Sequence, residues 1–292
     1  QKGVEQITKK MMILLFVLMI ILAVRSVTLP GAEKGLEFYL LPDFKKAAES
    51  GLKEVIFAAM GQAFFTLSIG IGALAIFGSY IGKERALTGE AVSICVLDTF
   101  VALMSGLIIF PSCFAYNVQP DSGPSLIFIS LPKVFASMGA IGRIIAIAFF
   151  LMMGFAALTS CVSVMETLVA NCMEIFHKSR QKMCAVIGIY SLVTAVLICL
   201  GYNVLYFEVK LPNGTVAQLL DIMDYISNSF LMPFISLLTS ILIGWVVGPK
   251  LIFDEVERNG EHFRRAKLYC FMIRYAVPVV MLILFLVSTG II

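Results

Sequence analysis

The stretch 55–80 reads VIFAAMGQAFFTLSIGIGALAIFGSY, and it decides how this chain folds. The stretch is apolar and long enough to cross a bilayer, for which about 20 apolar residues suffice. Glycines stand near its middle, at 70 and 72, although a glycine costs about 1 kcal/mol in a helix interior. Two interpretations stay open: close packing between helices through small residues, or a broken helix whose unwound backbone points at a substrate.

Similar apolar runs lie on both sides of this stretch. They occupy 11–24 with its flanks, 91–115, 144–169, 183–200, 230–247 and 271–292. Of the 292 residues, 60% are hydrophobic and 14% are charged, which argues against a soluble enzyme, a nucleic-acid binder or a disordered chain. Because a bilayer holds no water for the backbone, each span must be a helix or part of a closed barrel. The runs are continuous rather than alternating, so the sequence predicts an all-α membrane protein with roughly seven spans, one of them discontinuous.

Cationic residues predict the orientation of the spans. If the spans alternate, one side collects Lys2, Lys9, Lys10, Lys83, Arg85, Lys178, Arg180, Lys182, Lys250, Arg258, Arg264, Arg265 and Lys267. Positive loops stay inside the cell, so we expect a multi-pass protein of the cell (inner) membrane with a cytoplasmic N-terminus. The net charge of +3 is too small to imply a nucleic-acid partner.

Polar residues inside the spans are the candidate functional residues. Asp98 lies well inside the span 91–115, where a charge costs about 2.5–3.5 kcal/mol, so we expect it to face the bundle and to serve an ion or a proton. Thr159 and Ser160 lie in the run AALTS at 156–160; in a membrane helix such hydroxyls usually bond back to their own turn. Glu166 is also within a span, and the sequence assigns it no role.

Several segments, taken together, resemble one family. The run GQAFFTLSIGIG at 61–72 resembles the sixth helix of the sodium:neurotransmitter symporter family, in its bacterial amino-acid branch. Four further segments resemble other helices of the family: KGVE at 2–5 the fifth, AALTS at 156–160 the eighth, DIMD at 221–224 the tenth and YCFMIRYAVP at 269–278 the eleventh. These segments follow the family's order and spacing, so the resemblance covers essentially the whole chain.

The resemblance implies an inverted-repeat, leucine-transporter-like fold that is present in part. The chain would be a C-terminal fragment that begins near the fifth helix and lacks the first four. As a single transmembrane bundle over 1–292, it would contain helix five at 8–29, broken helix six at 53–82, helix seven at 87–116, an outer-loop helix at 124–138, helix eight at 141–175, helix nine at 181–201, helix ten at 216–248 and helix eleven at 267–292.

The resemblance also implies two sodium sites, each incomplete in this chain, and no organic cofactor. Thr66 and Asp98 match the first site, while the carbonyl of Ala156 and the hydroxyls of Thr159 and Ser160 match the second. Asp98 replaces the asparagine of many members, which leaves proton coupling open. Ala102 stands where chloride-dependent members carry serine, so we expect chloride not to be required.

The implied substrate is a neutral, hydrophobic amino acid, and the matching positions are Phe65, Thr66, Ser68, Ile71, Ser160 and Val164. Gate positions match as well: Phe65 and Gln62 with Asp224 on the outer side, and Tyr80 with Glu174 on the inner side.

Three hypotheses follow for function. The first is sodium-coupled amino-acid symport by alternating access in the full-length protein. The second is a non-transporting remnant that packs against another membrane chain, and assembly of several copies stays open. The third is an intramembrane aspartyl protease that uses Asp98 with Asp221 or Asp224; the absence of a GxGD motif argues against it, and we expect no enzyme.

Overall fold

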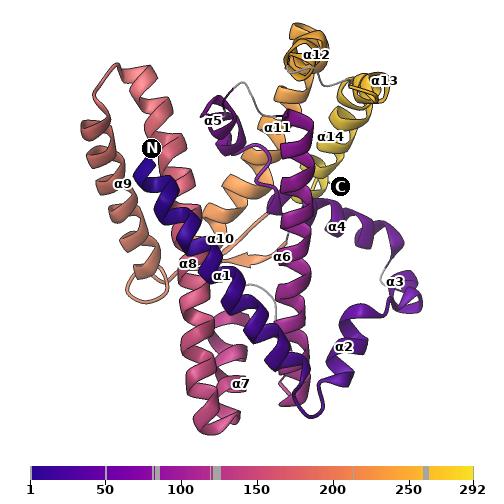
Figure 1. Ribbon diagram of the computed structural model, residues 1–292, viewed down its shortest axis with the longest axis vertical. Coiled ribbons are helices and arrows are strands. Elements are labelled where there is room, and N and C mark those ends of the chain that lie inside the picture. The colour runs from indigo at the N-terminus through magenta and orange to yellow at the C-terminus, as the bar shows by residue number, and fades with distance from the viewer. Residues whose placement is uncertain are drawn as a thin grey trace. The chain divides into compact units, whose positions relative to one another are not determined.

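A computed structural model of the chain describes residues 2–49, 51–80, 82, 86–118, 120, 126–212, 214–258 and 263–291. In these residues the chain is mostly helical (Figure 1). The β structure among them is one hairpin, in which β1 (Val209–Lys210) pairs antiparallel with β2 (Val216–Ala217). Positions 81, 124, 125 and 292 of the expected helices lie outside the described residues.

Six helical spans in the described part of the chain are long and apolar enough to cross a membrane. Four are continuous: α1 (Lys2–Val27), α6 (Leu87–Ala115), α8 (Gly139–Phe176) and α9 (Arg180–Leu200). The other two contain π-helical segments. One consists of α10 (Leu219–Asp224), η2 (Tyr225–Leu231), α11 (Met232–Ile241) and η3 (Leu242–Val247). The other consists of α13 (Ala266–Phe271), η4 (Met272–Ala276) and α14 (Val277–Ser288).

The shorter helices include the two halves of the broken span. These halves are α4 (Leu52–Thr66) and α5 (Ala73–Tyr80). The other short elements are α2 (Glu33–Leu40), α3 (Phe44–Glu49), η1 (Leu126–Ser130), α7 (Leu131–Ser137) and α12 (Lys250–Glu257). The predicted all-α membrane fold with one discontinuous span is confirmed.

The start of α10 differs from the expected start of helix ten at 216. Residues 216 and 217 belong to strand β2, and the helix begins at Leu219. The Gln218 backbone N–H donates to Asp221 Oδ2 at 3.0 Å. This bond satisfies a backbone donor that the helix itself leaves unpaired, and it therefore marks where the helix begins.

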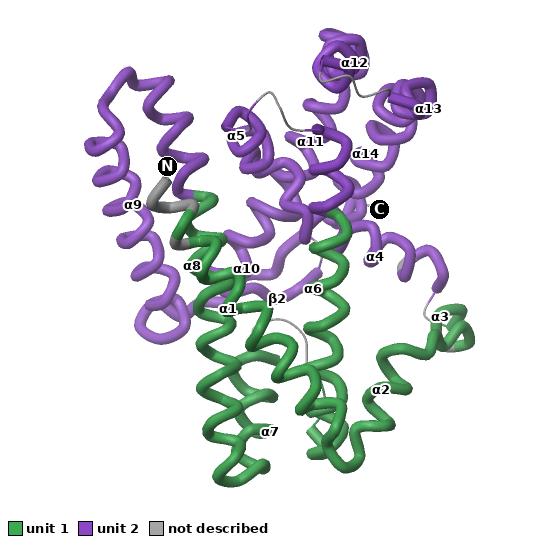
Figure 2. Tube along the Cα trace, in the orientation of Figure 1, with its two compact units in different colours: residues 1–49, 95–164 green, residues 50–94, 165–292 purple. Residues whose placement is uncertain are grey.

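The chain divides into two compact units, drawn in two colours in Figure 2. Unit 1 comprises residues 1–49 and 95–164, and unit 2 comprises residues 50–94 and 165–292. The long helices α6 and α8 contribute residues to both units.

Unit 1 has its core where α1, α6, α7 and α8 meet. Buried side chains from the four helices include Met19, Cys113, Val134 and Phe149. A polar contact lies beside them: the Ser26 hydroxyl donates to the carbonyl oxygen of Ile108 at 2.7 Å and shares a hydrogen bond with the Ser112 hydroxyl. Buried hydroxyls that are paired in this way hold α1 against α6 without an unsatisfied polar group.

Unit 2 is built around the contact of α11 with α14. Phe64 of α4, Met232 of α11 and Leu284 of α14 form its small buried cluster. The first half of the broken span is therefore packed against the last two membrane-length spans.

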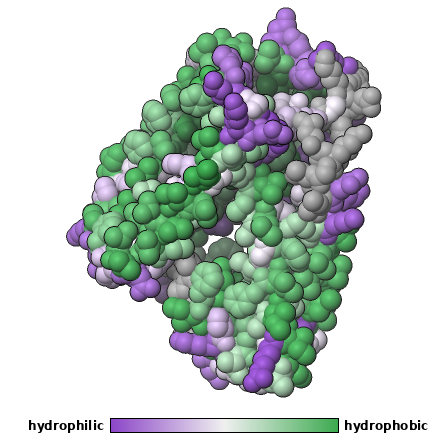
Figure 3. Space-filling view, turned by 90° about the vertical axis from the view of Figure 1, so that its left-hand side faces the viewer, coloured by the Kyte–Doolittle hydropathy of each residue, from purple (hydrophilic) through white to green (hydrophobic). Residues whose placement is uncertain are grey.

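Many large apolar side chains of the long helices are exposed (Figure 3). On α1, the buried side includes Leu15, Met19 and Leu22, while Val17 and Val24 are exposed at 47% and 60%. A helix that is apolar on its exposed side suits a lipid environment and not water.

Candidate substrate and ion site

The broken span is interrupted between Thr66 and Ala73. Within the interruption the backbone takes positive φ at Ser68 (51°), Gly70 (98°) and Gly72 (84°). Glycine adopts such angles without a steric penalty, and the two glycines therefore permit the break locally. Ser68 has a Cβ atom, so its left-handed conformation is disfavoured by about 1–2 kcal/mol and must be held by the surrounding structure.

Gly70 is needed for a second reason, which is contact with α11. A Cβ atom at this position would lie 2.7 Å from the carbonyl oxygen of Met232 and 2.7 Å from Ser236 Oγ. Ser236 is 7% exposed, and its hydroxyl has no hydrogen-bond partner among the described residues. Both interpretations of the glycines thus hold at once: Gly70 breaks the helix and also lets the broken segment pack closely against a neighbour.

Unwinding leaves backbone oxygens available in the break. The hydrogen bonds from the N–H groups of Ile69 and Ile71 to the carbonyls of Phe64 and Ser68 are long, at 3.4 Å each. The carbonyls of Leu67, Ile69 and Gly70 accept no backbone hydrogen bond from any residue that the structure describes. Free carbonyls that are fixed by rigid flanking helices are suited to an ammonium group or a sodium ion.

The side chains of the break are accessible. Phe65 is 49% exposed and Ile71 is 38% exposed, while Thr66 and Ser68 are half-buried. Thr66 Oγ1 donates to the Ala63 carbonyl at 3.3 Å, one turn back. All of these predicted substrate or sodium positions lie in unit 2.

The remaining predicted ligands lie in unit 1, on α6 and α8. Asp98 is half-buried on α6, and Ala156, Thr159 and Ser160 share α8 with Val164. Thr159 Oγ1 donates to the Ala156 carbonyl at 2.8 Å. Two of the predicted oxygen ligands of the second sodium site are therefore adjacent on one face of α8. No group of three His, Cys, Asp or Glu side chains that could hold a metal ion occurs among the described residues; a sodium site built from carbonyls and hydroxyls needs none.

Tyr80, a predicted gate residue, contacts Glu166. The Tyr80 hydroxyl donates to Glu166 Oε1 at 3.0 Å, and the Arg180 guanidinium donates to both oxygens of the same carboxylate, at 2.9 and 2.5 Å. The Glu166 side chain is 14% exposed and that of Arg180 is 44% exposed. Glu174, the other predicted inner-gate residue, is exposed and makes no hydrogen bond to another described residue.

Glu166 is the functional candidate for which sequence reasoning found no role. Its partners come from α5 and from the first residue of α9. The turn between α8 and α9 is short, with His177 at a φ of 50°, and it brings Arg180 back beside the last turns of α8. The sequence signal that could have indicated this contact is a carboxylate inside a span, Glu166, followed by an arginine at the start of the next helix, Arg180.

The aspartates near the start of α10 have local partners. Asp221 caps the helix through Gln218, and the Asn228 side chain donates to Asp224 Oδ1 at 2.5 Å. Asp224 and Gln62 are both exposed within unit 2. This arrangement gives Asp221 a structural role.

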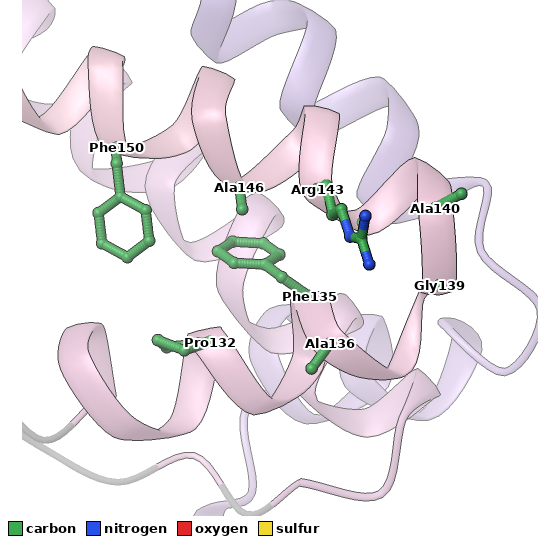
Figure 4. Close-up of a pocket in the computed structure, with 9 residues that line it drawn as sticks. Pro132, Phe135, Ala136, Gly139, Ala140, Arg143, Ala146 and Phe150 are labelled. Carbon is green, nitrogen blue, oxygen red and sulfur yellow. The ribbon is translucent and has the colours of Figure 1, made fainter.

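A cavity of about 530 Å³ lies in unit 1 between α7 and the first turns of α8 (Figure 4). Phe135 and Phe150 contribute aromatic walls, and Arg143 is the charged residue among its lining residues. None of the predicted substrate or sodium positions lines this cavity.

Membrane-length helices with one span broken at glycines, and with free carbonyls in the break, are typical of secondary transporters. The chain belongs to the sodium:neurotransmitter symporter family, whose profile matches residues 1–291. The predicted family is thereby confirmed, and it comprises transporters rather than enzymes. The aspartyl-protease hypothesis is not supported.

Individual relatives agree with this assignment. An uncharacterized sodium-dependent transporter of Bacillus subtilis, YhdH, is 36% identical over 293 residues, which span 100% of this chain and 63% of the relative. An uncharacterized sodium-dependent transporter of Haemophilus influenzae is 33% identical, over 97% of this chain and 60% of the relative. The crystal structure of MhsT in complex with L-phenylalanine superimposes with a TM-score of 0.81 at 37% identity, covering 96% of this chain and 62% of MhsT. The chain thus spans about three fifths of the length of these relatives.

Proposed function

We propose that the full-length protein carries a neutral, hydrophobic amino acid across the cell membrane together with sodium, by alternating access. One observation carries this proposal: the break at 67–72, with unpaired carbonyls between two helices. Family membership supports the use of sodium. The proposal concerns the whole protein, because the chain spans only part of the length of its relatives.

The substrate class follows from the side chains at the predicted substrate positions. Phe65 and Ile71 in the break and Val164 on α8 are apolar and partly exposed, so they suit a hydrophobic side chain. We assign the ammonium group to the free carbonyls of the break, with the Thr66, Ser68 and Ser160 hydroxyls as polar contacts. MhsT, whose crystal structure contains L-phenylalanine, is a relative of fitting chemistry.

Sodium would be held by oxygen atoms, because a hard cation prefers them. We assign Thr66 and Asp98 to one ion, and Ala156, Thr159 and Ser160 to the other. The Thr159 hydroxyl now donates to the Ala156 carbonyl at 2.8 Å. When an ion enters, both oxygens must face it, so this hydrogen bond is exchanged for ion contacts.

Gating would use contacts at both ends of the break. On the inner side, we assign Tyr80 and Glu174, together with Glu166, which holds Tyr80 of α5 at 3.0 Å. On the outer side, we assign Phe65 as a cap, and Asp224, with Gln62 beside it, as the partner of an arginine on the first helix of the full-length protein. Breaking the Tyr80–Glu166 contact would release α5 from α8, which is a change that inward opening requires.

The test is uptake of radiolabelled L-phenylalanine by the full-length protein in proteoliposomes. We expect uptake with an inward sodium gradient and a much lower rate with potassium in its place. Equal uptake in both conditions would reject sodium coupling. Uptake that is unchanged when gluconate replaces chloride would support chloride independence, and accessibility of Lys9 and Lys10 to a membrane-impermeant reagent would report the side of the N-terminus.

A matched pair of variants tests the second ion position. Thr159→Ala removes a ligand oxygen and should weaken sodium affinity about tenfold or more, because a contact to a charge contributes about 1.5–3 kcal/mol. Thr194→Ala is the control, since Thr194 on α9 makes the same kind of back-bond, 2.9 Å to the Tyr190 carbonyl. The sodium concentration for half-maximal uptake is the measurement. Equal values in the two variants would remove the assignment of Thr159.

A further inference from the structure

The side chains of Trp245 and Arg274 each donate a hydrogen bond to a backbone carbonyl of the other's span. The Trp245 indole N–H donates to the Arg274 carbonyl at 2.9 Å, and Arg274 Nε donates to the Gly244 carbonyl at 3.0 Å. The backbones approach closely here, because a Cβ atom on Gly244 would lie 2.9 Å from the Ile273 carbonyl oxygen. These contacts join η3 to η4 and fix the two spans in register.

This register sets Arg274 level with the end of the neighbouring membrane-length span. Trp245 stands near the end of the span Leu219–Val247, just before Gly248, Pro249 and Lys250. Arg274 is level with it, although the apolar span to which Arg274 belongs begins earlier, at Ala266. Beside them, Tyr275 makes an edge contact with Trp245, with ring centroids 5.5 Å apart. Tryptophan and tyrosine collect at the membrane interface.

The guanidinium of Arg274 has donors to spare. Its Nε is used by Gly244, while its terminal nitrogens make no ion pair with any carboxylate in the described residues. The stretch 263–274 reads FRRAKLYCFMIR and carries four cations and no carboxylate. A guanidinium held by Nε presents its remaining nitrogens as a planar fork, which matches two phosphate oxygens.

The surroundings of that fork are apolar and exposed. Trp245 is 58% exposed, Tyr275 is 51% exposed, and Val246 and Phe271 are 73% and 58% exposed. A free anion in water would gain nothing from these side chains, whereas a lipid would cover them with its glycerol and acyl chains.

We propose that Arg274, Trp245 and Tyr275 form a binding site for one anionic phospholipid, with the headgroup phosphate on the Arg274 fork and the acyl region against the two rings. The partner is the membrane itself, on the side where the cations of 250–267 lie. Such a lipid would brace the two helix ends that Trp245 and Arg274 already join.

The chain supplies its own probe, because Trp245 is its single tryptophan. The chain is reconstituted in nanodiscs that contain brominated phosphatidylglycerol or brominated phosphatidylcholine, since bromine quenches indole emission on contact. We expect the anionic lipid to reach half-quenching at about a fivefold lower mole fraction, from the usual contribution of one basic residue near the surface. High salt should reduce this preference.

Two substitutions identify the residue responsible. Arg274→Gln should abolish the preference, while Arg143→Gln at the first turns of α8 should retain it. Equal quenching by the two lipids in the unsubstituted chain would overturn the proposal, as would a preference that survives Arg274→Gln. If Arg274→Gln does not fold, the unsubstituted chain is titrated with soluble glycerol phosphate while quenching by the brominated anionic lipid is measured. Loss of quenching at millimolar glycerol phosphate would indicate a site for a free anion and overturn the proposal. Unchanged quenching would support it.

Discussion

Three glycines of the broken span separate the effect of backbone conformation from the effect of close packing. Gly61 lies within α4, with no positive φ and with open space where a Cβ atom would be. Gly72 has a φ of 84°, but its nearest neighbour would be 4.0 Å away. Gly70 has both a φ of 98° and backbone and hydroxyl oxygens at 2.7 Å. An alanine substitution therefore introduces neither backbone strain nor a clash at Gly61, backbone strain at Gly72, and both strain and a clash at Gly70.

The expected magnitudes differ accordingly. Gly61→Ala should be neutral or should stabilise by up to about 1 kcal/mol, because alanine favours a helix. Gly72→Ala should destabilise by about 1–3 kcal/mol from backbone strain alone. In Gly70→Ala the strain adds to overpacking of about 1–3 kcal/mol, which gives a total of about 2–6 kcal/mol by adding the two effects.

Unfolding by sodium dodecyl sulfate in mixed micelles, followed by circular dichroism, measures these free energies. The order of stability should be Gly61→Ala above Gly72→Ala above Gly70→Ala. If Gly70→Ala proved as stable as Gly61→Ala, the break would not have the observed backbone, and the argument for free carbonyls at Leu67, Ile69 and Gly70 would be lost.

Two further predictions concern side chains of unit 2. Glu166→Gln should weaken the contact between α8 and α5 by about 0.5–1 kcal/mol, since the partner Arg180 is 44% exposed and solvent screens the pair. Hydrogen exchange in α5 should therefore become about two- to fivefold faster. Glu255→Gln, on the exposed pair with Arg258, should leave α5 unchanged, and equal exchange in both variants would contradict the role of Glu166. Ser236→Ala should be neutral or stabilise the protein by about 1 kcal/mol, because it removes a buried unpaired hydroxyl. Ser240→Ala should destabilise the protein, because it removes the hydrogen bond to the Leu237 carbonyl. The same detergent titration tests both variants, and a large loss of stability in Ser236→Ala would show that the hydroxyl is paired.

The sequence by itself determined the all-α membrane class and, through the resemblance of its motifs, the family and its discontinuous span. Each of these depends on residues that are close in the chain: continuous apolar runs, two glycines separated by one residue, and motifs of four to twelve residues in a known order. The assignment of positions 156, 159 and 160 to one ion came from the resemblance, and helical spacing adds only that residues three or four apart share a face.

Only the tertiary structure decided which distant groups meet. Glu166 had no role in the sequence, and its contacts with Tyr80 and Arg180 depend on how three helices are set against one another. The reciprocal bonds of Trp245 and Arg274 likewise depend on the register of two spans, which no local pattern specifies. Strand β2 replaced the expected start of helix ten because its partner strand lies across a turn, and pairing across a turn is a property of the folded chain. Side-chain contacts of this kind come from packing, and packing is set by the whole fold rather than by neighbours in the sequence.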